Sequence, residues 1–244
     1  MKKVFARLAV SAVLITAMLS GCSTAKETAD ENYVVKINGE TVSREEFNIY
    51  MYETQKSFES LGGEDIWETD FDGRSAETVA KDNTLSTITL VKFAEEKAAS
   101  AGIELDEETI AEAEASAEEV YNGLTDSEKE DIGADLELYK EVMRENALYN
   151  EVYKYMVKDY VISDEEFDEY YESNKDTITE QYKAYTGVSD SEETVDEAQV
   201  KDFARYYYEE NMKQQYFAGE FEKWQSEADI EKNAQLWNTV TLIR

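Results

Sequence analysis

Residues 33–47, with the sequence YVVKINGETVSREEF, decide the fold of this chain. Three of the five residues before Asn38 (Val34, Val35 and Ile37) are β-branched, which favours a strand. Asn38 and Gly39 form a dipeptide that favours a tight hairpin turn, because both residues tolerate positive φ. Ser43, followed three residues later by Glu46, predicts a helix N-terminus with a capping box. This stretch therefore predicts a short hairpin that leads directly into a helix.

Helical patterns fill most of the chain that follows. Apolar residues recur at helical spacing, and Ser, Thr or Asp stands at the start of each periodic run. The predicted helices cover residues 43–63, 75–100, 125–133, 135–160 and 194–228, and two more begin at Asp106 and Ser163. The chain contains no proline, which fits long uninterrupted helices, since proline breaks helix interiors.

The segments between the helices are predicted to be loops. Residues 64–74 contain Asp70, Asp72 and Gly73, a pattern that hints at a calcium loop. The remaining ligand positions of an EF-hand do not follow, so a turn at Asp72 and Gly73 is favoured. Residues 187–195 are polar and also predict a loop.

The end of the chain predicts a second strand. Residues 236–243 are β-prone and follow a break at 229–233. A three- or four-residue strand is not stable alone, so we expect residues 34–37 to pair with residues 239–243. The predicted fold class is mainly α, a multi-helix domain with a small β element that pairs the N- and C-terminal strands.

The N-terminus has the pattern of a bacterial lipoprotein signal peptide. A basic start precedes an apolar run at residues 8–19, and Leu19-Ser20-Gly21-Cys22 ends it. The apolar run is too short to span a bilayer comfortably, so an uncleaved membrane helix is the less favoured alternative. We expect residues 1–21 to be removed and Cys22 to carry a diacylglycerol and a palmitate-type acyl chain.

This assignment predicts the organisation and location of the mature protein. Residues 22–31 would be a lipid-anchored tether, and residues 32–244 a helical domain, either one large unit or two small lobes. The expected location is the extracytoplasmic face of the cell membrane, at a Gram-positive cell surface, and the expected membrane contact is the lipid on Cys22.

The net charge of the chain argues against nucleic acid as a partner. The chain has 24 Lys and Arg against 56 Asp and Glu, a net charge of −32. Without residues 1–21, which hold three basic and no acidic side chains, the net charge is −35. Binding to nucleic acid needs clustered Lys and Arg to neutralise phosphates, so no nucleic-acid partner is expected.

Composition also argues against catalysis. The chain has no histidine, and Cys22 is its only cysteine, which excludes Ser-His and Cys-His hydrolytic machinery. Carboxylate pairs such as Glu209 and Glu210 could serve a glycosidase, but 56 acidic residues make such pairs inevitable. We predict no cofactor, no metal site and no catalytic residue.

Four motifs in order resemble those of the SurA/PrsA-type extracytoplasmic chaperones. They lie at residues 33–47, 99–106, 161–171 and 221–237, so the resemblance covers most of 33–172 and 217–243. Members of this family often carry a parvulin-type prolyl isomerase between such flanks, with histidine in its site. Here only residues 173–216 occupy that place, and they predict helix and acidic loop.

The resemblance implies a chaperone or foldase-like protein that binds unfolded or nascent secreted proteins without prolyl isomerase activity. The Tyr170-Tyr171 pair and the tyrosine run at 206–208 cannot all face a core, which leaves rings for a client. The candidate client-binding residues are Tyr171, Tyr206 and Met212. The alternative is a surface lipoprotein that acts as an adhesin or as a scaffold.

Overall fold

The computed structural model describes residues 33–187 and 195–243. The predicted hairpin is confirmed: β1 (Val35–Ile37) pairs antiparallel with β2 (Glu40–Val42). The turn between them places Asn38 at φ 50° and Gly39 at φ 91°, the left-handed region that favours this dipeptide. Helix α1 (Arg44–Gly62) follows at once, and the Ser43 hydroxyl accepts a hydrogen bond from the Glu46 amide at 3.0 Å.

The predicted helices are confirmed, with ends shifted by a few residues. They are α2 (Ala76–Ala101), α3 (Glu107–Gly123), α4 (Asp126–Ile132), α5 (Leu136–Val157), α6 (Asp164–Thr186) and α7 (Glu197–Glu227). Thr125 and Glu128 form the predicted capping box of α4. Thr194, the predicted cap of the last long helix, lies outside the described residues, and the Asp196 side chain caps α7 instead.

The loop predicted at residues 64–74 is more regular than expected. It contains a 3₁₀ helix, η1 (Glu64–Glu68), and a small hairpin of β3 (Asp70–Phe71) and β4 (Arg74–Ser75). The favoured turn is confirmed, because Asp72 and Gly73 both have positive φ at 54° and 83°.

The two ends of the domain meet in one sheet, but the C-terminal strand is not the predicted one. The strand order is β2-β1-β5, where β5 (Ile230–Lys232) pairs antiparallel with β1 and Lys36 faces Glu231. The expected pairing of 34–37 with 239–243 is wrong, and the expected break at 229–233 is where the strand forms.

Chain connectivity explains the correction. Helix α7 ends beside the β-turn, where Asn38 and Asp229 exchange hydrogen bonds: the Asn38 amide donates to the Asp229 carbonyl, and the Asp229 amide donates to the Asn38 side chain, both at 2.8 Å. The first residues after α7 therefore fill the free edge of β1. The short helix α8 (Ala234–Trp237) follows, and Val240 and Ile243 are buried in an irregular tail.

The main lobe comprises residues 33–157 and 228–243. Its core joins the sheet, α1, α2 and α5, and includes the fully buried Phe47, Met51 and Tyr139. The tail closes this core, because the Gln55 side-chain amide exchanges two hydrogen bonds of 2.9 Å with the backbone of Ile243. The β-prone composition of the tail thus reflects burial without strand pairing.

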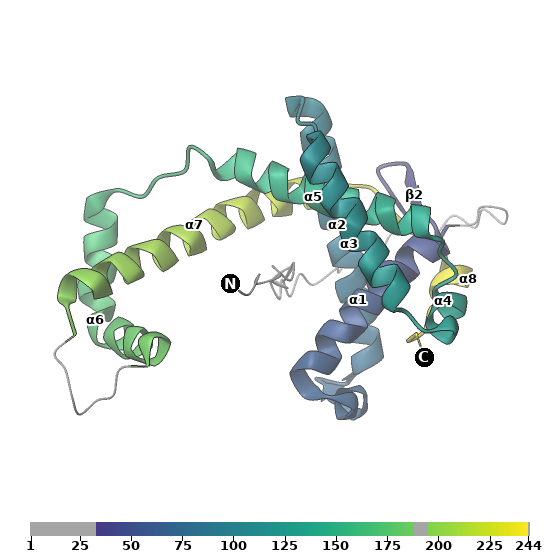
Figure 1. Ribbon diagram of the computed structural model, residues 1–244, viewed down its shortest axis with the longest axis horizontal. Helices are drawn as coiled ribbons and strands as arrows, with labels where there is room; N and C mark the ends of the chain where they lie inside the picture. Colours follow the sequence, from purple (N-terminus) through teal and green to yellow (C-terminus); the bar gives the residue numbers. More distant parts are fainter. Residues whose placement is uncertain (1–32, 188–194, 244) are drawn as a thin grey trace.

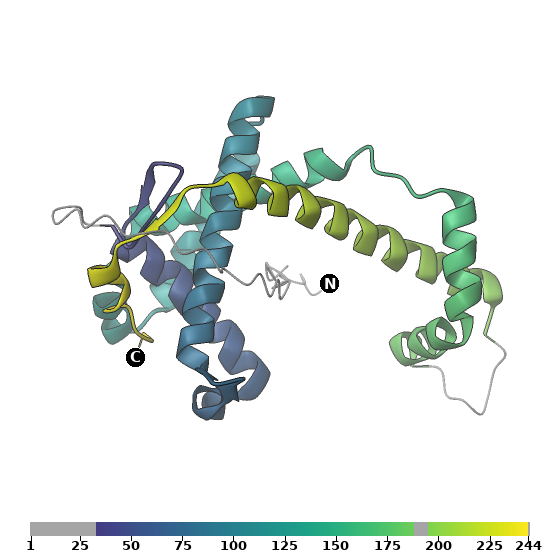
Figure 2. The ribbon, with the colours of Figure 1, turned by 180° about the vertical axis from the view of Figure 1, so that it is seen from behind.

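The arm, defined here as residues 164–187 and 195–216, projects from the main lobe (Figures 1 and 2). It consists of α6 packed on the N-terminal part of α7. Its core contains Phe167, Tyr171, Ile178, Val200 and Ala204, and Ile162 from the segment before α6 packs into the same core. Helix α7 continues from the arm into the main lobe, so the ribbon forms an arch with α6 at one end and α1 and α2 at the other (Figure 1).

A cluster of aromatic rings fixes the arm to the main lobe. Phe217 of α7 lies 5.7 Å from Phe93 of α2 and 5.2 Å from Tyr153 of α5, measured between ring centroids. Phe221 and Trp224 each lie 5.5 Å from the Phe93 ring. Such contacts make one end of α7 part of the main lobe while its other end carries α6.

Candidate functional site

Exposed aromatic side chains concentrate on and beside the arm. Eight large hydrophobic side chains are exposed among the described residues, and six of them lie between positions 155 and 216: Tyr155, Val161, Tyr185, Tyr206, Tyr207 and Tyr216. Large exposed apolar groups that gather on one region mark an interaction surface more often than scattered ones. The arm is therefore the candidate binding region.

Five rings form what we call the tyrosine patch: Tyr182, Tyr185, Phe203, Tyr206 and Tyr207. Phe203 is its centre, with ring centroids 5.5 Å from Tyr182, 5.4 Å from Tyr185 and 4.5 Å from Tyr207. Tyr206 adds to the edge, 5.3 Å from Tyr207. The exposed fractions of Tyr185, Tyr206 and Tyr207 are 71%, 63% and 48%, so the patch presents ring surface to solvent.

Helical spacing builds the tyrosine patch. Tyr182 and Tyr185 lie three residues apart on α6, and Phe203 and Tyr207 lie four apart on α7, so each pair shares one helix face. Phe217 lies fourteen residues after Phe203, and Phe221 lies fourteen residues after Tyr207. Fourteen residues are close to four helical turns, so both pairs lie on nearly the same side of α7. The patch therefore lies on the side of α7 that packs against the main lobe further along the helix.

A recess lies where the chain passes from α5 toward α6. It has a volume of about 460 Å³ and is lined by Tyr155, Met156, Lys158, Asp159, Tyr160 and Tyr216. Tyr160 and Tyr216 lie 5.3 Å apart, and the Lys158 ammonium sits over the Tyr155 ring at 3.9 Å. The recess adds apolar surface beside the arm.

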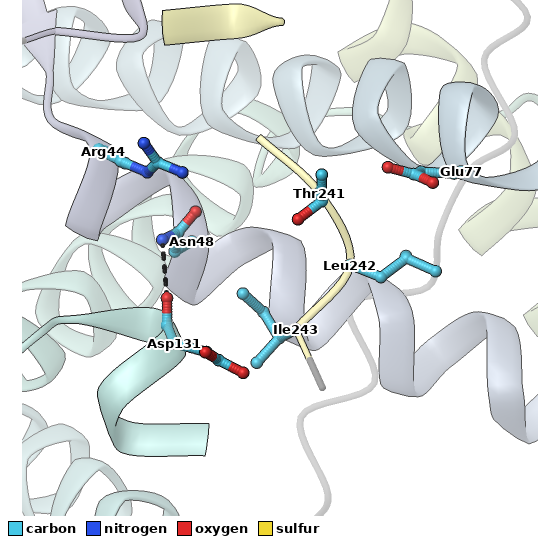
Figure 3. Close-up of a pocket in the computed structure, with 7 residues that line it drawn as sticks. All are labelled: Arg44, Asn48, Glu77, Asp131, Thr241, Leu242 and Ile243. Carbon is cyan, nitrogen blue, oxygen red and sulfur yellow. Dashed lines mark hydrogen bonds between the residues drawn. The ribbon is translucent and has the colours of Figure 1, made fainter. Parts of the chain in front are cut away.

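A second cavity, of about 530 Å³, lies between α1 and the C-terminal tail (Figure 3). Arg44 donates to the Thr239 hydroxyl and carbonyl at 3.2 and 3.0 Å, and the Asn48 amide donates to the Asp131 and Ile132 carbonyls at 3.2 and 3.1 Å. These polar groups hold the tail and the end of α4 in place. Arg44 and Asn48, two of the polar side chains that line this cavity, therefore serve to hold the fold together.

Ionisable groups inside the main lobe form a buried network. The Lys92 ammonium lies 3.1 Å from Glu145, 3.0 Å from Glu95 and 3.6 Å from Glu46, and the Tyr50 hydroxyl donates to Glu145 at 3.1 Å. Burial raises the pKa of Glu46 to about 7, against the opposing effect of Lys92, and burial likewise raises the pKa of Glu95. The network links α1, α2 and α5, whereas the tyrosine patch lies on α6 and α7.

The structure separates the predicted client-binding residues. Tyr206 is exposed and belongs to the tyrosine patch, while Met212 is half-buried against the arm core. Tyr171 is only 1% exposed, so it does not offer a surface ring in this structure. It lies four residues after Phe167 on the inward face of α6, and its ring is 6.0 Å from that of Phe167. Cys22 lies outside the described residues.

The sequence-based selection missed Tyr182, Tyr185, Phe203 and Tyr207. Their spacing of three and four residues was visible in the sequence, but the same spacing also marks a buried stripe. Only the packing of α6 on α7 shows that this stripe reaches the surface. Among residues 33–187 and 195–243, no group of three or more His, Cys, Asp or Glu side chains is arranged to hold a metal ion.

Comparison with known proteins identifies the class. A family model described as the SurA-like N-terminal domain matches residues 1–130, more than half of the chain, so the chain belongs to this family. A curated relative is the foldase protein PrsA of Caldanaerobacter subterraneus subsp. tengcongensis, with 25% identity over 173 residues. The match covers 70% of this chain and 52% of the relative, so the chain spans about half the length of that curated relative.

These findings confirm the resemblance to SurA/PrsA-type chaperone domains and suggest a chaperone or foldase family. No solved structure matches the chain. In the part of the chain that the structure describes, no helix is both long enough and apolar enough to cross a membrane.

Proposed function

We propose that this protein is a lipid-anchored extracytoplasmic chaperone that binds unfolded or nascent secreted proteins and has no prolyl isomerase activity. The observation that carries the proposal is the tyrosine patch on the arm, in a chain whose residues 1–130 match the SurA-like N-terminal domain. Tyrosine rings combine a large apolar face with a polar tip, so they can contact many different unfolded segments. The signal pattern that ends at Cys22 supports the anchor and the compartment.

The family resemblance implies that residues 173–216, which include most of the arm, stand where other members carry the isomerase. Residues 173–187 and 195–216 fold as parts of α6 and α7, and the whole chain has no histidine. Both facts support a binding role for this segment in place of catalysis.

An aggregation assay tests the proposed function. The soluble form, residues 22–244 with Cys22→Ser, should suppress light scattering by a reduced or heat-unfolded client near stoichiometric ratio. The double variant Tyr206→Ser/Tyr207→Ser should lose most of that protection. Leu61→Ser is the control, because Leu61 is an apolar residue outside the arm, at the C-terminal end of α1, and its exposed fraction of 81% exceeds those of Tyr206 and Tyr207.

Each part of the proposal has an outcome that would contradict it. No protection by the unmodified protein would remove the chaperone role, and a pulldown that recovers one stoichiometric partner would favour a scaffold. Acceleration of prolyl isomerisation in a proline-containing peptide above the uncatalysed rate would contradict the absence of catalysis. Loss of radiolabelled palmitate incorporation in Cys22→Ala is expected, and continued incorporation would contradict the anchor.

A further inference from the structure

We propose that the tyrosine patch selects cationic client segments, in which Lys or Arg stands next to an aromatic or large aliphatic residue. This inference rests on the proposed function and narrows it to one chemical class of client. It is carried by three features of the arm: its excess of carboxylates, the commitment of its own basic groups, and exposed rings over which no described cation lies.

The arm carries a strong excess of negative charge. Its described residues, 164–187 and 195–216, contain thirteen Asp and Glu but only five Lys and Arg. Asp202 and Glu180 belong to the same stretches of helix as the tyrosine patch, and Glu209 follows it closely on α7. A low-dielectric aromatic surface inside such a field attracts cations and repels anionic segments.

The five basic side chains of the arm are already committed to ion pairs. Lys183 pairs with Glu180 at 2.9 Å, Lys213 with Glu210 at 2.8 Å, and Lys175 with Glu197. The other two tie α7 to the start of α6: Lys201 pairs with Asp168 at 2.8 Å, and Arg205 with Asp164 at 2.7 Å. An anionic client would therefore have to break one of these ion pairs before it could pair with a described basic group of the arm.

Described basic groups of the arm lie over rings of the arm core and leave the rings of the tyrosine patch without a cation. Within the described arm, cations lie over rings of the arm core: Arg205 is 4.4 Å from the Phe167 ring, and Lys201 is 5.6 Å from the Tyr171 ring. No such contact to a ring of the tyrosine patch is seen among the described residues. A Lys or Arg of a client could therefore lie over Tyr185, Tyr206 or Tyr207, where the carboxylates add to the attraction.

Apolar contact and charge act together at this surface. An exposed ring gives shape-tolerant contact to a large side chain, and a neighbouring cation gains from both the ring face and the carboxylates. A client segment with only cations would lack the first contribution, and one with only apolar residues would lack the second. The expected ligand is therefore an extended segment that carries both.

Fluorescence anisotropy with three unfolded 15-residue peptides tests the inference. The first alternates Lys with Phe and Leu, the second replaces each Lys with Glu, and the third keeps Lys but replaces Phe and Leu with Ser. We expect the first to bind the soluble form at least tenfold more tightly than either of the others. The difference between the Lys and Glu peptides should shrink from 50 to 500 mM salt, because salt screens exposed charges.

Variants locate the binding. Tyr206→Ser/Tyr207→Ser should weaken the Lys–Phe peptide at least tenfold, whereas Leu61→Ser should leave its affinity unchanged. Equal affinity for the Lys and Glu peptides would overturn this inference and leave the proposed chaperone function standing. Equal affinity for the Lys–Phe and Lys–Ser peptides, or unchanged affinity in the double tyrosine variant, would also overturn it. Failure of every peptide to bind, together with no protection of an aggregating client, would overturn both proposals.

Discussion

Glu46 shows how one buried residue can set the pH response of this domain. Its side chain is 12% exposed, its Oε1 atom has no hydrogen-bond partner, and the Lys92 ammonium lies 3.6 Å away. Burial dominates and raises the pKa of Glu46 to about 7 from its ordinary value of 4.5. Between these two pH values the folded state holds a proton that the unfolded state has released. Stability from this group is therefore greatest below pH 4.5 and falls as the pH rises to 7.

The substitution Glu46→Gln should flatten this dependence. The variant cannot ionise at position 46, and Lys92 keeps Glu95 and Glu145 as partners. Between pH 5 and pH 7.5 the free energy of unfolding should fall in both proteins. We expect the fall to be smaller in the variant than in the unmodified protein, and the difference between the two to be roughly 1–3 kcal/mol. Urea unfolding followed by circular dichroism at both pH values measures the difference.

An exposed glutamate provides the control for charge alone. Glu119→Gln, on the exposed face of α3, removes the same formal charge and should leave the pH dependence nearly unchanged. Equal pH dependence in Glu46→Gln and the unmodified protein would show that Glu46 does not titrate in this window.

Residue types predicted helix ends well and exposure poorly. Ser43, Thr125 and Ser163 cap the helices they were predicted to start, because a cap depends on neighbours within one turn. Tyr171 and Tyr206 have the same side chain but are 1% and 63% exposed, because their environments depend on a second helix. Local chemistry therefore identified caps, and only packing separated core rings from surface rings.

At the scale of elements, β5 is the segment that closes the domain. Hydrogen-bonded pairs recur every second residue in an antiparallel ladder. The Asn38 amide donates to the Asp229 carbonyl, and the Asn233 amide donates to the Val34 carbonyl. Lys36 and Glu231 form the pair halfway between these two, so the Glu231 amide points toward β1. The corresponding position in the tail, Thr241, is exposed and lies outside any strand.

Two proline substitutions test this register. Glu231→Pro removes a ladder donor and leaves the Lys36 carbonyl without its partner, so it should lower the free energy of unfolding by about 2 kcal/mol. Thr241→Pro should cost less than half as much. Chemical denaturation of both variants gives the comparison, and a larger effect at Thr241 would favour the strand pairing first expected from composition.

At the scale of the whole molecule, α7 couples two separate hydrophobic cores. Its N-terminal part packs with α6 in the arm core, and its C-terminal part packs with Phe93 in the main lobe. Phe217 is 5% exposed and contacts rings from both α2 and α5. The orientation of the arm therefore depends on this cluster.

The substitution Phe217→Ala should loosen the arm. Truncation of a buried phenylalanine costs about 3–5 kcal/mol of stability. At this position the lost packing lies between the arm and the main lobe. Donor and acceptor dyes can be attached through Glu119→Cys on α3 and Asp176→Cys on α6, in a Cys22→Ser background. Single-molecule energy transfer should then show a broader distribution of the distance between the dyes in Phe217→Ala than in the protein with Phe217. Tyr216→Ala, at the neighbouring and 41% exposed position, is the control. An unchanged distribution in a folded Phe217→Ala variant would contradict this role.

The sequence by itself determined the local features of this protein. The turn at Asn38 and Gly39, the helix starts and the mainly helical class follow from spacing, caps and backbone preferences that act within a few residues. The order of four motifs also indicated the SurA/PrsA-type family, which the family model confirms.

Only the tertiary structure decided which segments meet. It chose residues 230–232 over 239–243 as the partner of β1, buried Tyr171, and gathered rings from α6 and α7 into the tyrosine patch. Such pairings join residues far apart in the chain and depend on where each helix ends and what it packs against. Periodicity shows that a helix has an apolar face, but the neighbouring elements determine whether that face is core or surface.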